Sequence, residues 1–185
     1  MTATENRSIE QLGWTWDMIE DASKWGFNCG PGALCAVLNK TPEEIRPHLR
    51  GFEDKGYTNP SLMARILRDL KIPFRRLFES TREPEIDDWK WPDFGLVRVQ
   101  WSGPWTKPGV PIRVRYRHTH WIAHRKDNSF GEIFDVNCLS AGGWVPFNEW
   151  TMQVVPWLVK KVEPKSDGKW WPTHCWELRD RDETG

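Results

Sequence analysis

The stretch NCGPGALCAVL, residues Asn28–Leu38, decides the architecture of this chain. Helix-breaking residues open it and an unbroken apolar run closes it. Proline is favoured in the first turn of a helix, where its missing N–H is no loss. The pattern therefore predicts a buried helix that begins near Cys29. It places this thiol at the helix N-terminus, where free N–H groups and the helix dipole lower a thiol pKa.

Helical patterns also lie on both sides of this stretch. Upstream, apolar residues recur at helical spacing between Ile9 and Ile19. Downstream, Thr41–Glu44 has the sequence of a capping box, with proline at the first helical position. Asn59 and Pro60 begin a further helix, which we expect to end before residue 72. The first 70 residues are therefore predicted to be mainly helical.

After residue 72 the pattern changes to short runs typical of β-strands, separated by loops rich in proline, glycine and tryptophan. The predicted strands are Pro73–Phe78, Gly95–Trp101, Ile112–Ala123, Glu132–Val136 and Gln153–Val162. Helices followed by strands predict an α+β domain, with N-terminal helices packed on an antiparallel β-sheet, rather than a doubly wound parallel sheet.

Composition excludes several classes of function. The 26 basic and 26 acidic residues give a net charge of zero, so no overall field attracts nucleic acid or a membrane surface. The apolar runs are far shorter than the ~20 residues of a membrane-spanning helix. Residues 1–11 lack the apolar segment of a signal peptide, so a cytoplasmic location is expected. The 14 tryptophans follow no fixed period, and we expect them to fill a core and line a groove.

The candidate nucleophile is Cys29, because Cys35 falls inside the apolar run and is expected to be a packing residue. A reactive thiol needs a neighbouring imidazole. His120 lies on a predicted strand and precedes the apolar residues 121–123, so we expect it where this strand enters the core. Asp135 and Asn137 follow at the end of the next strand, and either can orient the imidazole through its second nitrogen.

Three segments resemble the papain-like cysteine peptidases: NCGPGAL at 28–34, HWIA at 120–123 and IFDVN at 133–137. Within that superfamily the chain is most similar to the bacterial and phage branch of C39-like, bacteriocin-processing peptidases. The resemblance implies a papain-like fold, with Cys29 as nucleophile, His120 as general base and acid, and Asp135 as orienter. Asn137 is the alternative third member.

The length of 185 residues and the lack of a low-complexity linker predict a single papain-like domain, with a helical segment at 1–24, a catalytic core at 25–162 and a C-terminal extension with a charged, frayed tail at 163–185. The resemblance implies a thiol hydrolase that cleaves a peptide or isopeptide bond without cofactor or metal. The expected partner is a peptide or protein substrate. Because a cytosolic peptidase must be restrained, we also expect either narrow specificity or a dedicated protein partner or inhibitor.

Two alternatives use the same residues. The family places a glutamine five or six residues before the cysteine to bind the oxyanion, whereas this chain has Lys24 and Ser23 there. The side chain of Asn28 and the N–H of Cys29 are candidate replacements. Without such a donor, the chain would be an inactive binding module with a tryptophan-lined groove. An acyltransferase would have the same triad.

A zinc site and a nucleic-acid surface are weaker interpretations. His118, His120 and His124 share one face of the predicted strand, but successive members lie ~7 and ~13 Å apart on an extended strand, so His118 and His124 are too far apart to share one ion. Arg113, Arg115 and Arg117 alternate on the opposite face, a pattern typical of a solvated sheet surface.

Overall fold

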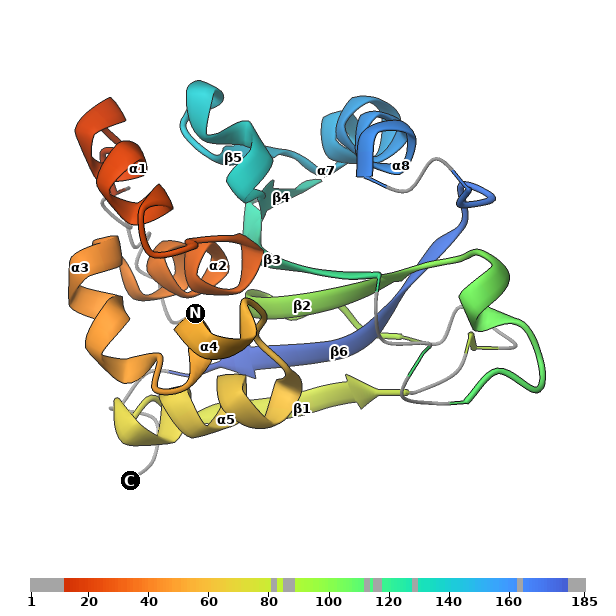
Figure 1. Ribbon diagram of the computed structural model, residues 1–185, viewed down its shortest axis with the longest axis horizontal. Coiled ribbons are helices and arrows are strands. Elements are labelled where there is room, and N and C mark those ends of the chain that lie inside the picture. The colour runs from red at the N-terminus through yellow and green to blue at the C-terminus, as the bar shows by residue number, and fades with distance from the viewer. Residues whose placement is uncertain are drawn as a thin grey trace, which may run out of the picture.

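The computed structural model describes residues 12–80, 83–84, 89–111, 114, 118–127, 130–162 and 165–179. Within these ranges the chain is a mixed α+β protein (Figure 1). Its helical elements are α1 (Trp16–Ser23), α2 (Cys29–Leu38), α3 (Pro42–Ile45), η1 (Arg46–His48), α4 (Phe52–Lys55), α5 (Pro60–Asp69), η2 (Pro104–Thr106), η3 (Val136–Ala141), α7 (Phe147–Glu149), the π-helix η4 (Trp150–Val154) and α8 (Val155–Val162).

The sheet contains β1 (Phe74–Glu79), β2 (Phe94–Trp101), β3 (Thr119–Asp127), β4 (Phe130–Phe134), β5 (Trp144–Pro146) and β6 (Trp170–Leu178). These six strands lie in the order β1-β6-β2-β3-β4-β5, and each neighbouring pair is antiparallel. The α+β class predicted from the sequence is therefore confirmed.

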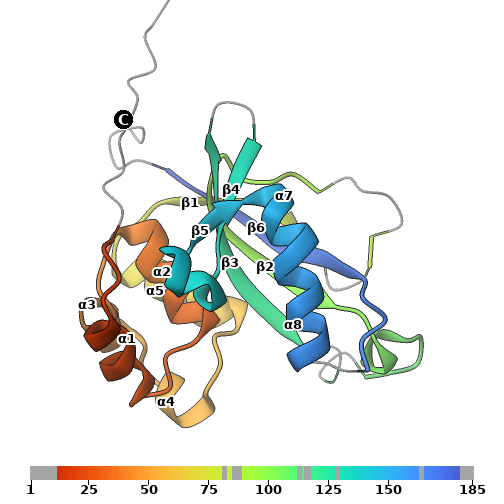
Figure 2. The same cartoon turned by 90° about the horizontal axis from the view of Figure 1, so that it is seen from above.

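Helices cover both faces of the sheet, with α1–α5 on one side and α7 and α8 on the other (Figure 2). Each face has its own apolar core. The first packs α2, α4 and α5 against the sheet and includes Leu34, Phe52, Ile66 and Trp176. The second packs η4 and α8 against the opposite face and includes Val97, Ile122, Ile133, Trp150 and Leu158.

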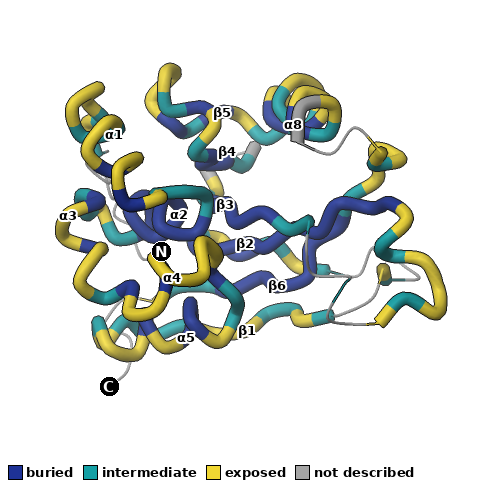
Figure 3. Tube along the Cα trace, viewed as in Figure 1, coloured by how far each residue is buried: buried dark blue, intermediate teal, exposed yellow. Residues whose placement is uncertain are grey.

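Helix α2 lies at the centre of the first core. Every residue from Gly30 to Val37 is buried, which explains why this helix is apolar on all sides instead of along one stripe (Figure 3). A Cβ on Gly32 would lie 3.2 Å from Val136, so glycine lets the helix approach the η3 segment closely. The predicted start of this helix at Cys29 is confirmed.

The capping predictions are also confirmed. Thr41 and Glu44 form the reciprocal hydrogen bonds of a capping box at the start of α3. Asn59 accepts a hydrogen bond from Leu62 N–H and caps α5, with Pro60 in its first turn. The predicted upstream helix is observed as α1, and residues 1–11 lie outside the described part of the chain.

Two segments differ from the sequence interpretation. The predicted strand Gln153–Val162 is wrong, because this segment is the end of η4 followed by α8. Residues 170–178, which the sequence places in a C-terminal extension, form β6 between β1 and β2. Strand β3 begins at Thr119, and most of the predicted strand before it lies outside the described residues, with Arg113, Arg115 and Arg117.

No helix in the described ranges is both long and apolar enough to cross a membrane.

Candidate active site

Cys29 is the first residue of α2, and Asn28 holds this helix start in place. The Asn28 side chain accepts a hydrogen bond from Gly30 N–H at 3.3 Å and donates one to the Gly56 carbonyl at 2.9 Å. Asn28 is therefore the N-cap and also joins α2 to the loop after α4. Beside it, a Cβ on Gly30 would lie 2.6 Å from the Cβ of Thr58, so only glycine fits there.

His120 lies in β3 at a point where the sheet leaves room for the nucleophile. Strand β2 pairs with β3 along Thr119–Arg125, whereas β4 pairs only with Ala123–Asp127. Helix α2 packs against β3, and the charge of His120, together with hydrogen bonding to its ring, lowers the pKa of the Cys29 thiol. His120 is 8% exposed, so the imidazole is largely shielded from water.

Asp135 follows the last residue of β4 and is fully buried. Its Oδ2 lies 2.9 Å from Nε2 of His120, which leaves Nδ1 of the ring for the thiol. The same Oδ2 accepts a hydrogen bond from the Trp150 indole N–H, also at 2.9 Å. Asn137 donates to the other oxygen, Oδ1, through its backbone N–H at 2.9 Å and its side chain at 2.7 Å.

These contacts bring together Cys29, His120 and Asp135, in the order expected from the sequence. Asn137, the alternative third member, contacts the carboxylate of Asp135 and helps to orient it. Four donors from His120, Trp150 and Asn137 thus surround the buried Asp135 carboxylate. These hydrogen bonds offset the cost of burying its charge.

The pKa directions favour charge separation between the thiol and the ring. Burial by itself raises the pKa of Cys29, but the charge and hydrogen bond of His120 and a backbone hydrogen bond from Trp121 outweigh it, so the thiol pKa is lowered. Burial alone lowers the pKa of His120, but Asp135 and Cys29 raise it well above its ordinary value. The pair therefore favours thiolate and imidazolium.

Asp135 stays ionised beside this pair. Burial raises the pKa of its carboxyl, but the charge of His120 and the hydrogen bonds from His120, Trp150 and Asn137 lower it further, to about 2. A carboxylate that remains charged can stabilise the imidazolium throughout the physiological pH range.

Cys29 and His120 open onto a cavity of about 980 Å³, which we call the Cys29 cavity. Its wall includes parts of the α2 and α5 N-termini, the loop between α4 and α5, and strands β2, β3 and β6. The lining residues are Asn28, Cys29, Gly56, Tyr57, Thr58, Asn59, Pro60, Ser61, Arg98, Trp101, His118, Thr119, His120, Trp121, Val136, Asn137, Leu158 and His174. Trp101 and Trp121 are thus the tryptophans that line this groove.

The first turn of α2 supplies a donor for an oxyanion. Gly30 N–H is hydrogen-bonded to Asn28 Oδ1, Pro31 has no N–H, and Gly32 N–H is bonded to the Asn28 carbonyl. Within this described turn, the Cys29 N–H remains as the backbone donor beside the thiol. Asn28 lines the cavity, but one hydrogen of its amide is engaged by Gly56.

The other cysteines lack an activating partner of this kind. Cys35 is fully buried in α2, and burial raises its pKa well above the ordinary value. Burial likewise raises the pKa values of Cys138 and Cys175 to about 12. These thiols stay protonated and behave as apolar packing groups.

The remaining histidines have separate surroundings. His118 packs against the Trp105 ring, with the ring centres 4.0 Å apart. His124 is buried against Trp91 and forms a hydrogen bond with the Pro92 carbonyl at 2.6 Å. Among the described residues, no three His, Cys, Asp or Glu side chains form a group that could hold a metal ion.

Three further residues lie at the site besides those predicted from the sequence. Trp150 contacts Asp135, Thr58 borders the first turn of α2, and Arg98 lines the Cys29 cavity from β2. Of the three, only Arg98 could have been recognised from the sequence, because a charged residue inside the mainly apolar run Gly95–Trp101 is unusual for a buried strand.

Comparison with models of protein families, with curated proteins and with solved structures found no match to this chain.

Proposed function

We propose that this chain is a papain-like cysteine hydrolase of the C39-like type that cleaves a peptide or isopeptide bond through an acyl-enzyme. The observation that carries the proposal is the continuous set of contacts from the Cys29 thiol through His120 to Asp135. The opposite pKa shifts of thiol and imidazole support it, because a thiolate is the attacking species. Helix α2 carries the nucleophile against an antiparallel sheet that carries the other two residues, which supports a papain-like fold.

The chemistry follows from these positions. The Cys29 thiolate attacks the substrate carbonyl carbon, and the Cys29 N–H stabilises the negative charge that develops on oxygen. The His120 imidazolium protonates the leaving amine, so the C–N bond breaks and a thioester remains. His120 then takes a proton from water as the water attacks the thioester, the C–S bond breaks, and the Cys29 thiolate leaves beside the protonated His120 as the acid product is released, which restores the starting pair.

The test is cleavage of a diverse peptide mixture, with products identified by mass spectrometry. The native protein and Cys35→Ala should both give new peptide ends, and Cys29→Ala should give none. A Cys29→Ala variant that retains cleavage would refute the proposal. Added amines test the acyltransferase alternative, which would convert the same peptides into amides of the added amine.

An inactive binding module is the second candidate, and one observation favours it. Ser23 and Lys24, at the positions where the family has its oxyanion-binding glutamine, are exposed and hydrogen-bonded to Glu20 and Asp21 of α1. A binding module would retain a peptide from the mixture without converting it. This candidate would be supported if the native protein and Cys29→Ala retained the same amount of peptide and the peptide recovered from the native protein were intact.

A further inference from the structure

The Cys29 cavity contains a buried cation that the proposed triad does not use. Arg98 lies in β2 and is only 4% exposed, yet it lines the cavity. Its Nη2 donates a hydrogen bond to Thr119 Oγ1 at 2.9 Å, which fixes the guanidinium toward β3. A guanidinium has five N–H donors, so it can bind a carboxylate in addition to the contacts that it already makes.

Arg98 and His120 reach the cavity from neighbouring strands. Arg98 pairs with Trp121 and Val99 pairs with His120, so the side chains of Arg98 and His120 leave opposite faces of the sheet at diagonal positions. Both side chains nevertheless line the Cys29 cavity, and Thr119, which accepts the hydrogen bond from Arg98, directly precedes His120. A substrate group bound at Arg98 would therefore lie in the same cavity as the bond that the thiolate attacks.

A second feature gives the same part of the cavity a positive potential. The N-termini of α2 and α5, two helices of ten residues each, both border it, at Cys29 and at Pro60. Helix N-termini attract negative charge. Among the described residues that line the cavity there is no aspartate or glutamate to offset these charges.

Thr58 lies between these two helix ends and supplies a donor. Its side chain is 6% exposed and lines the cavity, against the first turn of α2 at Gly30. Its hydroxyl has no hydrogen-bond partner among the described residues. The Thr58 carbonyl accepts a hydrogen bond from the Trp121 indole at 2.7 Å, which holds this residue in place. A buried hydroxyl without a protein partner can donate a hydrogen bond to a bound group.

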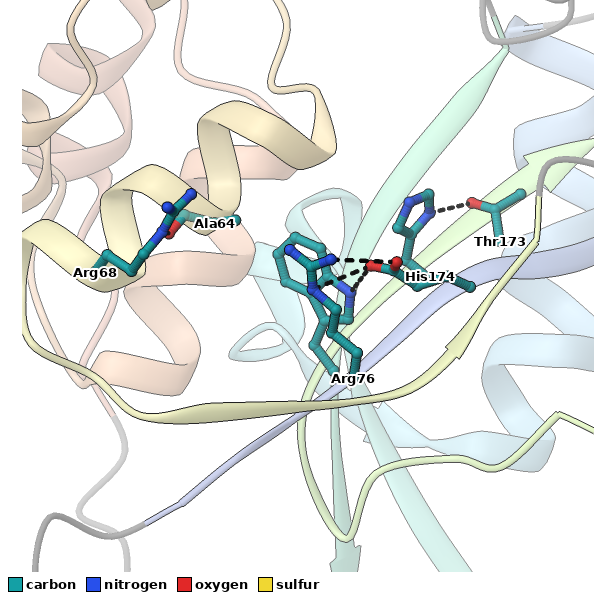
Figure 4. Close-up of polar contacts among 7 residues, drawn as sticks. Ala64, Arg68, Arg76, Thr173 and His174 are labelled. Atoms are coloured by element: carbon teal, nitrogen blue, oxygen red, sulfur yellow. Dashed lines mark hydrogen bonds and ion pairs between the residues drawn. The ribbon is translucent and has the colours of Figure 1, made fainter. Parts of the chain in front are cut away.

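The lowered pKa of His174 agrees with a positive charge on this side of the cavity. His174 lines the cavity on β6, and Figure 4 shows it near Arg76 of the adjacent strand β1. Burial, together with the charges of Arg98 and Arg76, lowers the pKa of His174 to about 3. The Arg76 side chain is paired with Glu79, which also accepts from the Trp176 indole. His174 is therefore neutral, and its ring offers a further polar group to a ligand.

We propose that Arg98, Thr58 and the N-terminus of α5 form a carboxylate-binding subsite of the Cys29 cavity, so that the preferred substrate carries a carboxylate close enough to the scissile bond to share this cavity. That the bound carboxylate belongs to a substrate rests on the proposed function. The carboxylate can belong to an aspartate or glutamate side chain or to the C-terminus of a peptide. Both present the same planar group to a guanidinium.

The test uses alkylating probes that differ only in charge, so it needs no known substrate. Iodoacetyl-glutamine amide is neutral, iodoacetyl-glutamate amide carries a side-chain carboxylate, and iodoacetyl-glutamine carries a terminal carboxylate. The rate constant for alkylation of Cys29 by each probe is measured at pH 6.5 by mass spectrometry. For each variant we divide the rate constant for the charged probe by the rate constant for the neutral probe. This ratio does not depend on the reactivity of the thiol itself, because both rate constants contain it.

In the native protein, at least one acidic probe should react about tenfold or more faster than the neutral probe, the effect of one charge-assisted hydrogen bond. The faster acidic probe identifies the source of the carboxylate. Arg98→Met and Thr58→Val should each lower the ratio, and Arg98→Lys should largely keep it. Arg75→Met is the matched control, because Arg75 is exposed on β1 and paired with Glu177. It should leave the ratio unchanged.

A native ratio near one, or a ratio that Arg98→Met leaves unchanged, would overturn the subsite. Should Arg98→Met fail to fold, Thr58→Val decides the question by the same criterion. The pH dependence of the neutral probe tests the thiolate separately. The subsite and the proposed catalytic pair can therefore fail independently.

Discussion

Nε2 of His120 lies 2.9 Å from Oδ2 of Asp135, and both residues are buried although fifteen positions separate them in the chain. The hairpin of β3 and β4 sets this relationship. Its register places Ala123 opposite Phe134, so the chain leaves β4 at Asp135 beside the part of β3 that β4 does not cover. The contact therefore depends on sheet pairing and does not require a flexible loop to close.

Acid should weaken the fold through Asp135. Its pKa is lowered from 3.8 to about 2, so the carboxylate stabilises the folded state above pH 4, and this contribution is lost as the pH falls from 4 to 2. The shift corresponds to about 2 kcal/mol. Urea unfolding of the native protein and Asp135→Asn at pH 5 and pH 2 measures it. The stability advantage of the native protein should shrink at pH 2, and a constant difference would contradict the assignment.

Trp150 is predicted to be a positioning residue for Asp135. Trp150→Phe keeps the aromatic ring but removes the indole donor, so a buried carboxylate loses a hydrogen bond. We expect a loss of about 1.5–3 kcal/mol in the free energy of unfolding at pH 7.

Trp171→Phe is the matched control for this variant. Trp171 is 4% exposed, and its indole nitrogen has no hydrogen-bond partner among the described residues. Its substitution should lower stability much less. The alkylation rate of Cys29 at pH 6 should also fall in Trp150→Phe and not in Trp171→Phe. Equal effects of the two variants on both quantities would show that Trp150 acts only by packing.

Cys29 and Cys35 should separate activity from stability. Cys29→Ala should reduce peptide cleavage by about 10³-fold or more, because removal of a nucleophile leaves only binding and oxyanion stabilisation. Its thermal unfolding should stay close to that of the native protein. Cys35→Ala should be active and less stable, since Cys35 is fully buried. Loss of cleavage in Cys35→Ala at unchanged stability would mean that the nucleophile is misplaced.

The contact between Gly30 and Thr58 should be intolerant of a single added methyl group. Gly30→Ala places its Cβ 2.6 Å from the Cβ of Thr58, so the loop before α5 must move away from α2. We expect a loss of about 1–3 kcal/mol in the free energy of unfolding and slower alkylation of Cys29. The double variant Gly30→Ala/Thr58→Gly should recover part of the lost stability and part of the lost alkylation rate. If neither quantity recovered, this contact would not be the cause of the losses.

Much of the site was predictable from the sequence because its signals are local. The breakers and apolar run at 28–38 predict α2 and its first residue, and the structure confirms both. Capping residues at Thr41 and Asn59 likewise mark helix starts that the structure confirms. His120 and Asp135 are predictable because each polar residue stands beside an apolar run: His120 precedes residues 121–123 in β3, and Asp135 directly follows β4.

The failures have equally specific causes. Pro172 lies within β6, and proline is unusual inside a central strand, so the segment did not resemble one. A register shift between Arg98 and Val99 accommodates it in the pairing with β2. The segment 153–162 is rich in valine, which favours strands, but its buried residues Val155 and Leu158 are three apart and face the sheet from one side of a helix. Trp150 and Thr58 reach the site through tertiary contacts, which leave no local pattern.

The central claim is that Cys29 and His120 form a thiolate–imidazolium pair, and the pH dependence of Cys29 alkylation by iodoacetamide tests it most directly. The lowered thiol pKa and the raised imidazole pKa predict rapid alkylation well below pH 7 in the native protein. In His120→Gln the thiol should react only as the pH approaches the pKa of an ordinary cysteine. Mass spectrometry should locate the adduct on Cys29 in both proteins. A native profile that rises only above pH 8, or one that His120→Gln does not alter, would contradict the account.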